Sequence, residues 1–199
     1  MKTITIFLLG LIFLAGCDKS ADEIVNAPVL NPLLTETEVT EEDFLPLPKK
    51  SALWMDSVFT LTQEIDGAIG GKMKLEKYYI SEDGDSIYIK AELSIPEGAF
   101  QGVETITMLV DNRVAFVHFY PEMVFDKELK FTQSFKNLNL ENYESGKIDF
   151  CFVAPDGTIE IIKRDGVEIK LREGEVKVSK AKLHHFSRYG WIRKAEEGG

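Results

Sequence analysis

Segments in which polar and apolar residues alternate, separated by turn dipeptides, constrain the fold of this chain most. "KMKLEKYYI" (72–80) and "SIYIKAEL" (86–93) alternate on the two sides of "EDGD". Further along, "PDGT", Asp165-Gly166 and Glu173-Gly174 separate "IEIIKR", "VEIKLR" and "EVKVSKAKL". Alternation predicts a half-buried strand, and Asp-Gly between two such segments predicts a hairpin because both residues tolerate a positive φ.

The number of these segments predicts an all-β domain over residues 51–199. With "ETITMLV", "VAFVHFY", "LKFTQSF" and "KIDFCFVA", this region contains nine or ten strand candidates. Such spacing is typical of an antiparallel sandwich or barrel. Roughly 150 residues suffice for one hydrophobic core and are too few for two. Helix is expected only in short stretches, around residues 122–127 and 138–143.

Residues 1–16 have the composition of a lipoprotein signal peptide. Met1-Lys2 form a short basic start, the uncharged run "ITIFLLGLIFLA" follows, and "LAGC" ends at Cys17. A spanning helix needs about 20 apolar residues, more than this run offers. "LAGC" resembles the bacterial lipobox, which implies that the Cys17 thiol is lipidated. We therefore expect a bacterial cell-envelope protein, lipid-anchored on the extracytoplasmic side of the inner or outer membrane. The alternative is an ordinary secretory peptide or an uncleaved anchor.

Residues 17–50 are expected to form the lipidated cysteine and a disordered, acidic, proline-rich tether. Residues 18–50 contain eight acidic residues against three basic ones, and no apolar periodicity persists. A flexible coil of this length spans roughly 30 Å on average and about 110 Å when fully stretched. The short runs "VLNPLL" and "DFLPLP" could instead dock on the domain.

The net charge restricts which partners are expected, and the cysteine count indicates the state of Cys151. The formal net charge is −10, which argues against nucleic acid, since nucleic-acid binding needs a basic footprint. It also argues against the protein lying flat on anionic lipid. Cys17 and Cys151 are the two cysteines. With Cys17 lipidated, Cys151 in "KIDFCFVA" is expected to be a buried, inert thiol.

Four fragments in a fixed order resemble the ZU-five-type domain: "GGKMKLEKYYI", "LSIPEGAF", "FYPEMVFDKELKF" and "HHFSRYGW". The resemblance covers about residues 70–191 and implies an antiparallel β-sandwich with immunoglobulin-like packing. Residues 55–69, which it does not cover, form an added strand or belong to the tether. The match is carried in the middle and at the end of the domain by Pro121, Phe125, Leu129, Phe131, His185, Phe186, Ser187, Tyr189 and Trp191.

Some members of that family cleave themselves before the serine of a His-Phe-Ser tripeptide, and many others carry the tripeptide without demonstrated cleavage. The resemblance implies that Ser187 attacks the Phe186 carbonyl, while neutral His185 takes the hydroxyl proton. The peptide must also be distorted before it shifts to an ester, which water then hydrolyses. In a regular strand the Cα atoms of His185 and Ser187 are about 6.5–7 Å apart. Their side chains therefore meet only if the strand kinks, with Phe186 in the core holding the bend. The plain alternative is an ordinary closing strand.

We expect a binding or structural module and no multi-turnover enzyme. The sequence contains no phosphate loop, nucleophile elbow or dinucleotide fingerprint. No cofactor or metal is expected, and "SEDGDS" and "APDGT" are more simply turns than calcium sites. Beyond the membrane, which the lipid anchor contacts, the expected partner is an envelope protein or a polysaccharide. Two alternatives stay open: single-turnover autoproteolysis between Phe186 and Ser187, and a β-barrel carrier of a small apolar ligand, which requires an internal cavity.

Overall fold

The computed structural model describes residues 40–52, 58–111 and 113–193, which belong to one compact unit, Thr35–Gly199. The proposed signal peptide and Cys17 lie outside the described residues. No helix in the described ranges has the length and apolar composition to cross a bilayer. Helical structure there is limited to three short 3-10 turns: η1 (Glu41–Asp43), η2 (Ser145–Lys147) and η3 (Leu171–Glu173).

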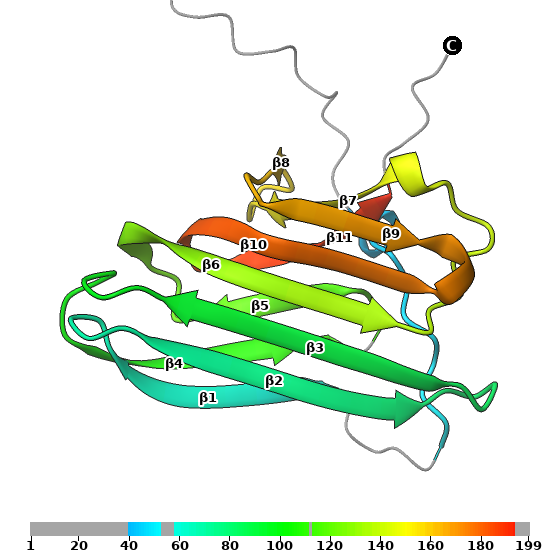
Figure 1. The fold of residues 1–199 in the computed structure, drawn as a ribbon, viewed down its shortest axis with the longest axis horizontal. Helices are drawn as coiled ribbons and strands as arrows, with labels where there is room; N and C mark the ends of the chain where they lie inside the picture. Colours follow the sequence, from blue (N-terminus) through cyan, green and yellow to red (C-terminus); the bar gives the residue numbers. More distant parts are fainter. Residues whose placement is uncertain (1–39, 53–57, 112, 194–199) are drawn as a thin grey trace, which may run out of the picture. The chain divides into compact units, whose positions relative to one another are not determined.

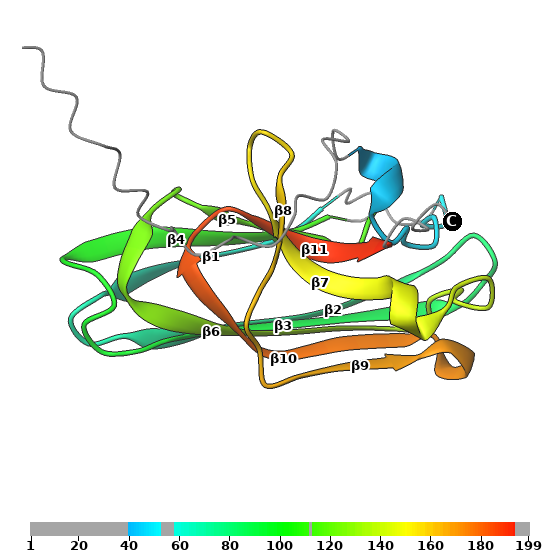
Figure 2. The ribbon, with the colours of Figure 1, turned by 90° about the horizontal axis from the view of Figure 1, so that it is seen from above.

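Two antiparallel sheets face each other (Figures 1 and 2), which confirms the expected all-β sandwich. The six-stranded sheet has the order β1 (Phe59–Asp66), β4 (Val103–Val110), β5 (Phe116–Tyr120), β11 (Arg188–Arg193), β7 (Ile148–Val153), β8 (Ile159–Ile161). The five-stranded sheet has the order β2 (Gly71–Ile80), β3 (Ser86–Ile95), β6 (Val124–Lys136), β10 (Glu175–His185), β9 (Gly166–Lys170).

Two predicted helical stretches are not helical. Most of residues 122–127 lies at the start of β6, whose 13 residues extend further than the sequence indicated. Within this stretch Val124 pairs with His185 of β10, and from Lys130 onward β6 also pairs with β3, so strand pairing outweighs local preference. Residues 138–143 lie in the loop after β6, with a turn at 141–142. Within residues 55–69, Phe59–Asp66 is the added strand β1, which pairs with β4 along its whole length.

Aromatic side chains from both sheets fill the interior. Phe119 of β5 meets Phe131 of β6 edge to face, with ring centroids 5.3 Å apart. Phe131 lies 6.1 Å from Phe150, which in turn packs on Trp191 at 5.4 Å. All four are fully buried. A carrier of an apolar ligand needs an internal cavity, and here these side chains occupy the space between the sheets.

The end of the predicted tether is part of the six-stranded sheet. The Leu45 N–H donates to the Trp191 carbonyl (2.8 Å), and the Leu45 carbonyl accepts from the Ala115 N–H (2.8 Å). Two residues on, the Leu47 N–H donates to the Arg113 carbonyl (2.8 Å). Leu45 is thus hydrogen-bonded on both sides, between β11 and the segment that precedes β5. We call residues 44–47 the inserted segment.

The inserted segment alternates as a strand does. The side chains of Leu45 and Leu47 are buried in the main core. Pro46 occupies the intervening position, where no N–H is needed, so its missing donor costs the ladder nothing. The folded domain therefore begins before the boundary expected at residue 51. The run "DFLPLP" docks on the domain, which was the alternative to its being part of the tether.

Phe44 covers a second apolar cluster, on the outer face of the six-stranded sheet. Its ring packs edge-on against Phe116, with centroids 5.8 Å apart. It also lies over Gly190, where an added Cβ would come within 3.1 Å of two ring carbons. Glycine at this position of β11 therefore leaves room for the ring. The other buried members of the cluster are Val114, Cys151, Val153 and Ile192.

Removing the Phe44 ring should destabilise the whole domain, because the inserted segment shares hydrogen bonds with β11. We expect Phe44→Ala to lower the free energy of unfolding by about 2–4 kcal/mol. Gly190→Ala should lower it by about 1–3 kcal/mol through overpacking against the ring. Gly146→Ala is the matched control, since a Cβ there meets nothing within 4 Å, and it should change stability by less than about 0.5 kcal/mol. Urea unfolding measures all three. A Phe44→Ala protein as stable as the parent would contradict the seating of this segment.

Candidate functional site

The His-Phe-Ser tripeptide lies where the chain passes from one sheet to the other. β10 ends at His185 and β11 begins at Arg188, so Phe186 and Ser187 form the connection. β10 belongs to the five-stranded sheet and β11 to the six-stranded sheet. Figure 2 shows the chain leaving β10 in one layer and turning into β11 in the other. The tripeptide is therefore a sheet-to-sheet crossover and not the regular closing strand that the sequence suggested. The kink arises because the last strand must change sheets.

Phe186 holds this crossover in place. Its ring stacks on Phe119 (centroids 5.0 Å apart, planes 13° apart) and meets Phe125 edge to face at 4.7 Å. Its N–H donates to the Met123 carbonyl (2.7 Å), and the Ser187 carbonyl accepts from the Phe119 N–H (3.0 Å). The expected role of Phe186 as a core residue that holds the bend agrees with these contacts.

His185 interacts with Tyr189. The Tyr189 hydroxyl donates to the His185 carbonyl (2.6 Å) and lies 3.4 Å from its Nδ1. Burial raises the pKa of the Tyr189 phenol, so the hydroxyl stays a donor. The His185 ring also packs edge-on against Phe152 at 4.5 Å. Within the described ranges no hydrogen bond joins His185 to the Ser187 hydroxyl, and the non-glycine residues with left-handed φ are Asn137 and Lys180, away from the crossover.

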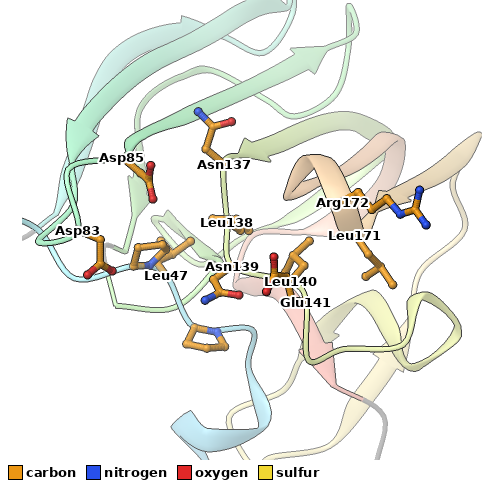
Figure 3. A pocket seen from close by; sticks show the side chains of 12 residues that line it. Leu47, Asp83, Asp85, Asn137, Leu138, Asn139, Leu140, Glu141, Leu171 and Arg172 are labelled. Atoms are coloured by element: carbon orange, nitrogen blue, oxygen red, sulfur yellow. The ribbon is translucent and has the colours of Figure 1, made fainter.

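A pocket of about 450 Å³ opens at one end of the sandwich, beside the end of the inserted segment and Pro48 (Figure 3). Four separate segments form its walls: the prolines around Leu47, the β2–β3 turn, the loop after β6, and η3. The carboxylates of Asp83 and Asp85 approach from one side and Arg172 from another, around Leu138 and Leu140. Hydrogen-bond acceptors and donors around an apolar floor suit a small polar ligand. No local motif signals this pocket, because its parts come together only in the fold.

Each of the two turns considered for calcium has one side chain that accepts a hydrogen bond from the turn's own backbone. The Asp156 carboxylate accepts from the Thr158 N–H (2.9 Å), and these hydrogen bonds lower the pKa of Asp156. Ser81 Oγ accepts from the Asp85 N–H (3.1 Å). In the part of the chain that the structure describes, no group of three or more His, Cys, Asp or Glu side chains is placed to hold a metal.

Cys151 is a buried thiol of the outer cluster, as expected from its apolar strand. Its Sγ donates weakly to the Gly190 carbonyl (3.6 Å). Burial, followed by the nearby Asp149 carboxylate, raises its pKa to about 12. The thiol is therefore protonated at neutral pH and unreactive as a nucleophile.

His118 is a residue that sequence reasoning did not single out. Its Nδ1 lies 2.7 Å from the Tyr120 hydroxyl, and its ring lies 3.9 Å from the Tyr120 ring. Its Nε2 is buried and has no partner among the described residues, and Arg188 is its cross-strand neighbour on β11. Burial, then the Arg188 charge, lowers the pKa of His118, while Glu122 acts in the opposite direction.

The purified protein should remain a single chain at the crossover, because His185 is engaged with Tyr189 and not with Ser187. Intact-mass spectrometry after prolonged incubation should give one polypeptide spanning residues 186 and 187. Ser187→Ala should behave identically. A pair of fragments meeting between Phe186 and Ser187, absent from the Ser187→Ala variant, would show that the crossover cleaves itself.

His118 should make the domain less stable in mild acid. Its folded-state pKa lies below its unfolded value of about 6.5, so the unfolded state binds the proton more tightly. Its contribution is therefore complete above pH 6.5 and is lost as the pH falls below that value. Urea unfolding at pH 7.5 and 5.5 should show this loss, and His118→Phe should reduce it. His184→Gln, an exposed histidine on the other sheet, should retain it. An unchanged pH dependence in His118→Phe would contradict the assignment.

No family model, curated protein or solved structure matches the chain. The all-β sandwich therefore rests on the observed strand topology, and the ZU-five-type assignment remains a prediction from the four sequence fragments.

Proposed function

We propose that the protein is a lipid-anchored lipoprotein of the bacterial cell envelope, on the extracytoplasmic side, whose β-sandwich serves as a binding or structural module. The observation that carries the proposal is the uncharged apolar run that leads to "LAGC" and Cys17, and the inserted segment shows how the chain after it joins the fold. The chain that follows the proposed anchor at Cys17 enters the six-stranded sheet at Phe44 and is hydrogen-bonded on both sides of Leu45. A lipid on Cys17 is then connected by this chain to the core of the domain, and so holds the domain near the membrane.

The inserted segment and η1 before it also shorten the proposed tether, to residues 18–40. A flexible chain of this length spans roughly 26 Å on average and about 80 Å when stretched. That reach suits a module that meets a partner close to its own membrane. The ZU-five-type assignment belongs to the same proposal, since that resemblance connects the fold to surface lipoproteins.

A binding role fits the surface better than catalysis does. The polar side chains of the open pocket, among them Asp83, Asp85 and Arg172, can exchange hydrogen bonds with hydroxyl or amide groups of a ligand. Its leucine floor offers apolar contact. An envelope protein or a polysaccharide has this chemistry and is the partner we propose. Autoproteolysis at Ser187 is the less favoured function, because among the described residues no hydrogen bond joins the His185 ring to the Ser187 hydroxyl, and Nδ1 faces Tyr189 instead.

The lipid anchor is tested at Cys17. In bacteria grown with labelled palmitate, the parent protein should carry the label and require detergent for extraction. Cys17→Ala should lose both properties, because no other residue offers the thiol that the lipobox reaction needs. Cys151→Ala is the matched control and should keep the label, since that thiol is buried and protonated. Labelling that persists in Cys17→Ala would refute the proposed anchor.

A further inference from the structure

A row of three lysines and one serine crosses four strands of the five-stranded sheet. Lys72 of β2 lies opposite Ser94 of β3, and Ser94 lies opposite Lys130 of β6. On its other side Lys130 lies opposite Lys182 of β10. All four side chains point to the outer face of the sheet. The residues on either side of each in its strand point inward, and most of them are buried. We call the four outward residues Lys72, Ser94, Lys130 and Lys182 the lysine row.

The lysine row departs from the charge pattern of the rest of this face. Elsewhere lysines are matched by acids: Glu76 accepts from both Lys74 (2.9 Å) and Lys90 (3.0 Å). In the row, by contrast, Lys130 faces Lys182, and like charges directly opposite each other destabilise a sheet. Among the described residues Lys130 has no carboxylate partner, whereas Lys72 and Lys182 are paired with Glu92 and Glu128, each at 3.1 Å.

The face as a whole is basic although the protein is acidic. The net charge of the chain is −10, yet lysines outnumber glutamates on the outer side of the five-stranded sheet. Charge is therefore segregated on the surface, and a local positive field can attract an anion despite the net charge. The residues concerned are Lys72, Lys74, Lys90, Lys130, Lys136, Lys170, Lys177 and Lys182 against Glu76, Glu92, Glu128, Glu168 and Glu175.

A hollow of about 280 Å³ lies within the row, at the end of the sheet where β2 begins and β3 ends. Lys72 and Lys130 line it on the two sides of Ser94, with Pro96 beside them. The Lys72 ammonium is bound to Glu92 (3.1 Å), so the Lys130 ammonium and the Ser94 hydroxyl are the donors left for an oxyanion. Glu128 also lines the hollow, but its charge is offset by Lys182 (3.1 Å), and its other carboxylate oxygen lies 3.4 Å from His184 Nε2. The hydrogen bond from Lys182 is the largest cause that lowers the pKa of Glu128.

We propose that this hollow binds a phosphate group. A doubly charged tetrahedral anion gives Lys130 the anionic partner that it lacks among the described residues, beside Ser94 and next to the ion pair of Lys72. The phosphate comes either from a free ion or from the headgroup of an anionic phospholipid. The proposal deepens the binding role proposed above and rests on it for the presence of a ligand, but not on the lipidation of Cys17.

The test is a backbone-amide NMR titration of the full-length protein in non-ionic detergent with inorganic phosphate at constant ionic strength. The amides of Lys72, Ser94 and Lys130 should shift and saturate. Lys130→Gln should weaken binding by up to about fivefold, the range of one exposed charge pair. Glu128→Gln should strengthen it by about two- to fivefold, because it removes the acid at the rim. Lys90→Gln, a paired lysine on the same face, should change it less than twofold.

A second arm separates the two sources of phosphate. The protein is placed in nanodiscs of phosphatidylcholine alone or with phosphatidylglycerol. A headgroup ligand should shift the same three amides only in the discs that contain phosphatidylglycerol, and inorganic phosphate should reverse the shift. A free-ion ligand should shift them only in the titration.

Two results would overturn the proposal. One is the absence of saturable shifts in both arms. The other is an equal weakening by Lys130→Gln and Lys90→Gln, which would indicate diffuse attraction to the whole face. Either result leaves the palmitate experiment on Cys17 unaffected, so a failure of this site is distinguishable from a failure of the proposed envelope role.

Discussion

The last strand of the chain holds the six-stranded sheet together. β11 pairs with β5 on one side and with β7 on the other, so it joins the β1-β4-β5 half to the β7-β8 half. The inserted segment adds to the same strand through Leu45, and Trp191 extends from it into the aromatic core. The N-terminal and C-terminal parts of the described chain therefore meet in the middle of one sheet. A change at β11 affects both halves of that sheet and the chain that leads to the proposed anchor.

The position of β11 explains why the His-Phe-Ser tripeptide is bent. The chain reaches β11 from the opposite sheet, and Phe186 fixes the crossing between Phe119 and Phe125. The hydroxyl of Tyr189 then holds the backbone at His185. A kink is one condition for self-cleavage, yet among the described residues no hydrogen bond joins His185 to the Ser187 hydroxyl. The tripeptide forms the joint between the two sheets, and the contacts of Phe186 hold it there.

The alternation of polar and apolar residues predicted the strands well, because in a half-buried strand every second side chain faces the core. What depends on the register between strands could not be predicted. The lysine row exists only because Ser94, Lys130 and Lys182 align across three strands, and the pocket of Figure 3 combines segments far apart in sequence. Gln133 shows another limit: it faces the core between Phe131 and Phe135, and neither polar atom of its amide has a partner among the described residues. Such a group costs about 1–3 kcal/mol, and local pattern gives no reason for it.

The inserted segment could be predicted only as an alternative, because its four apolar and proline residues are too few to distinguish a docked strand from a tether. Its importance follows from where it lands, beside β11. Amide hydrogen exchange of the full-length protein tests this most directly. We expect the amides of Leu45, Ala115 and Trp191 to exchange slowly and at similar rates, because they open together. Fast exchange at Leu45 alongside a protected Trp191 would contradict it, since the segment would then lie outside the cooperative fold.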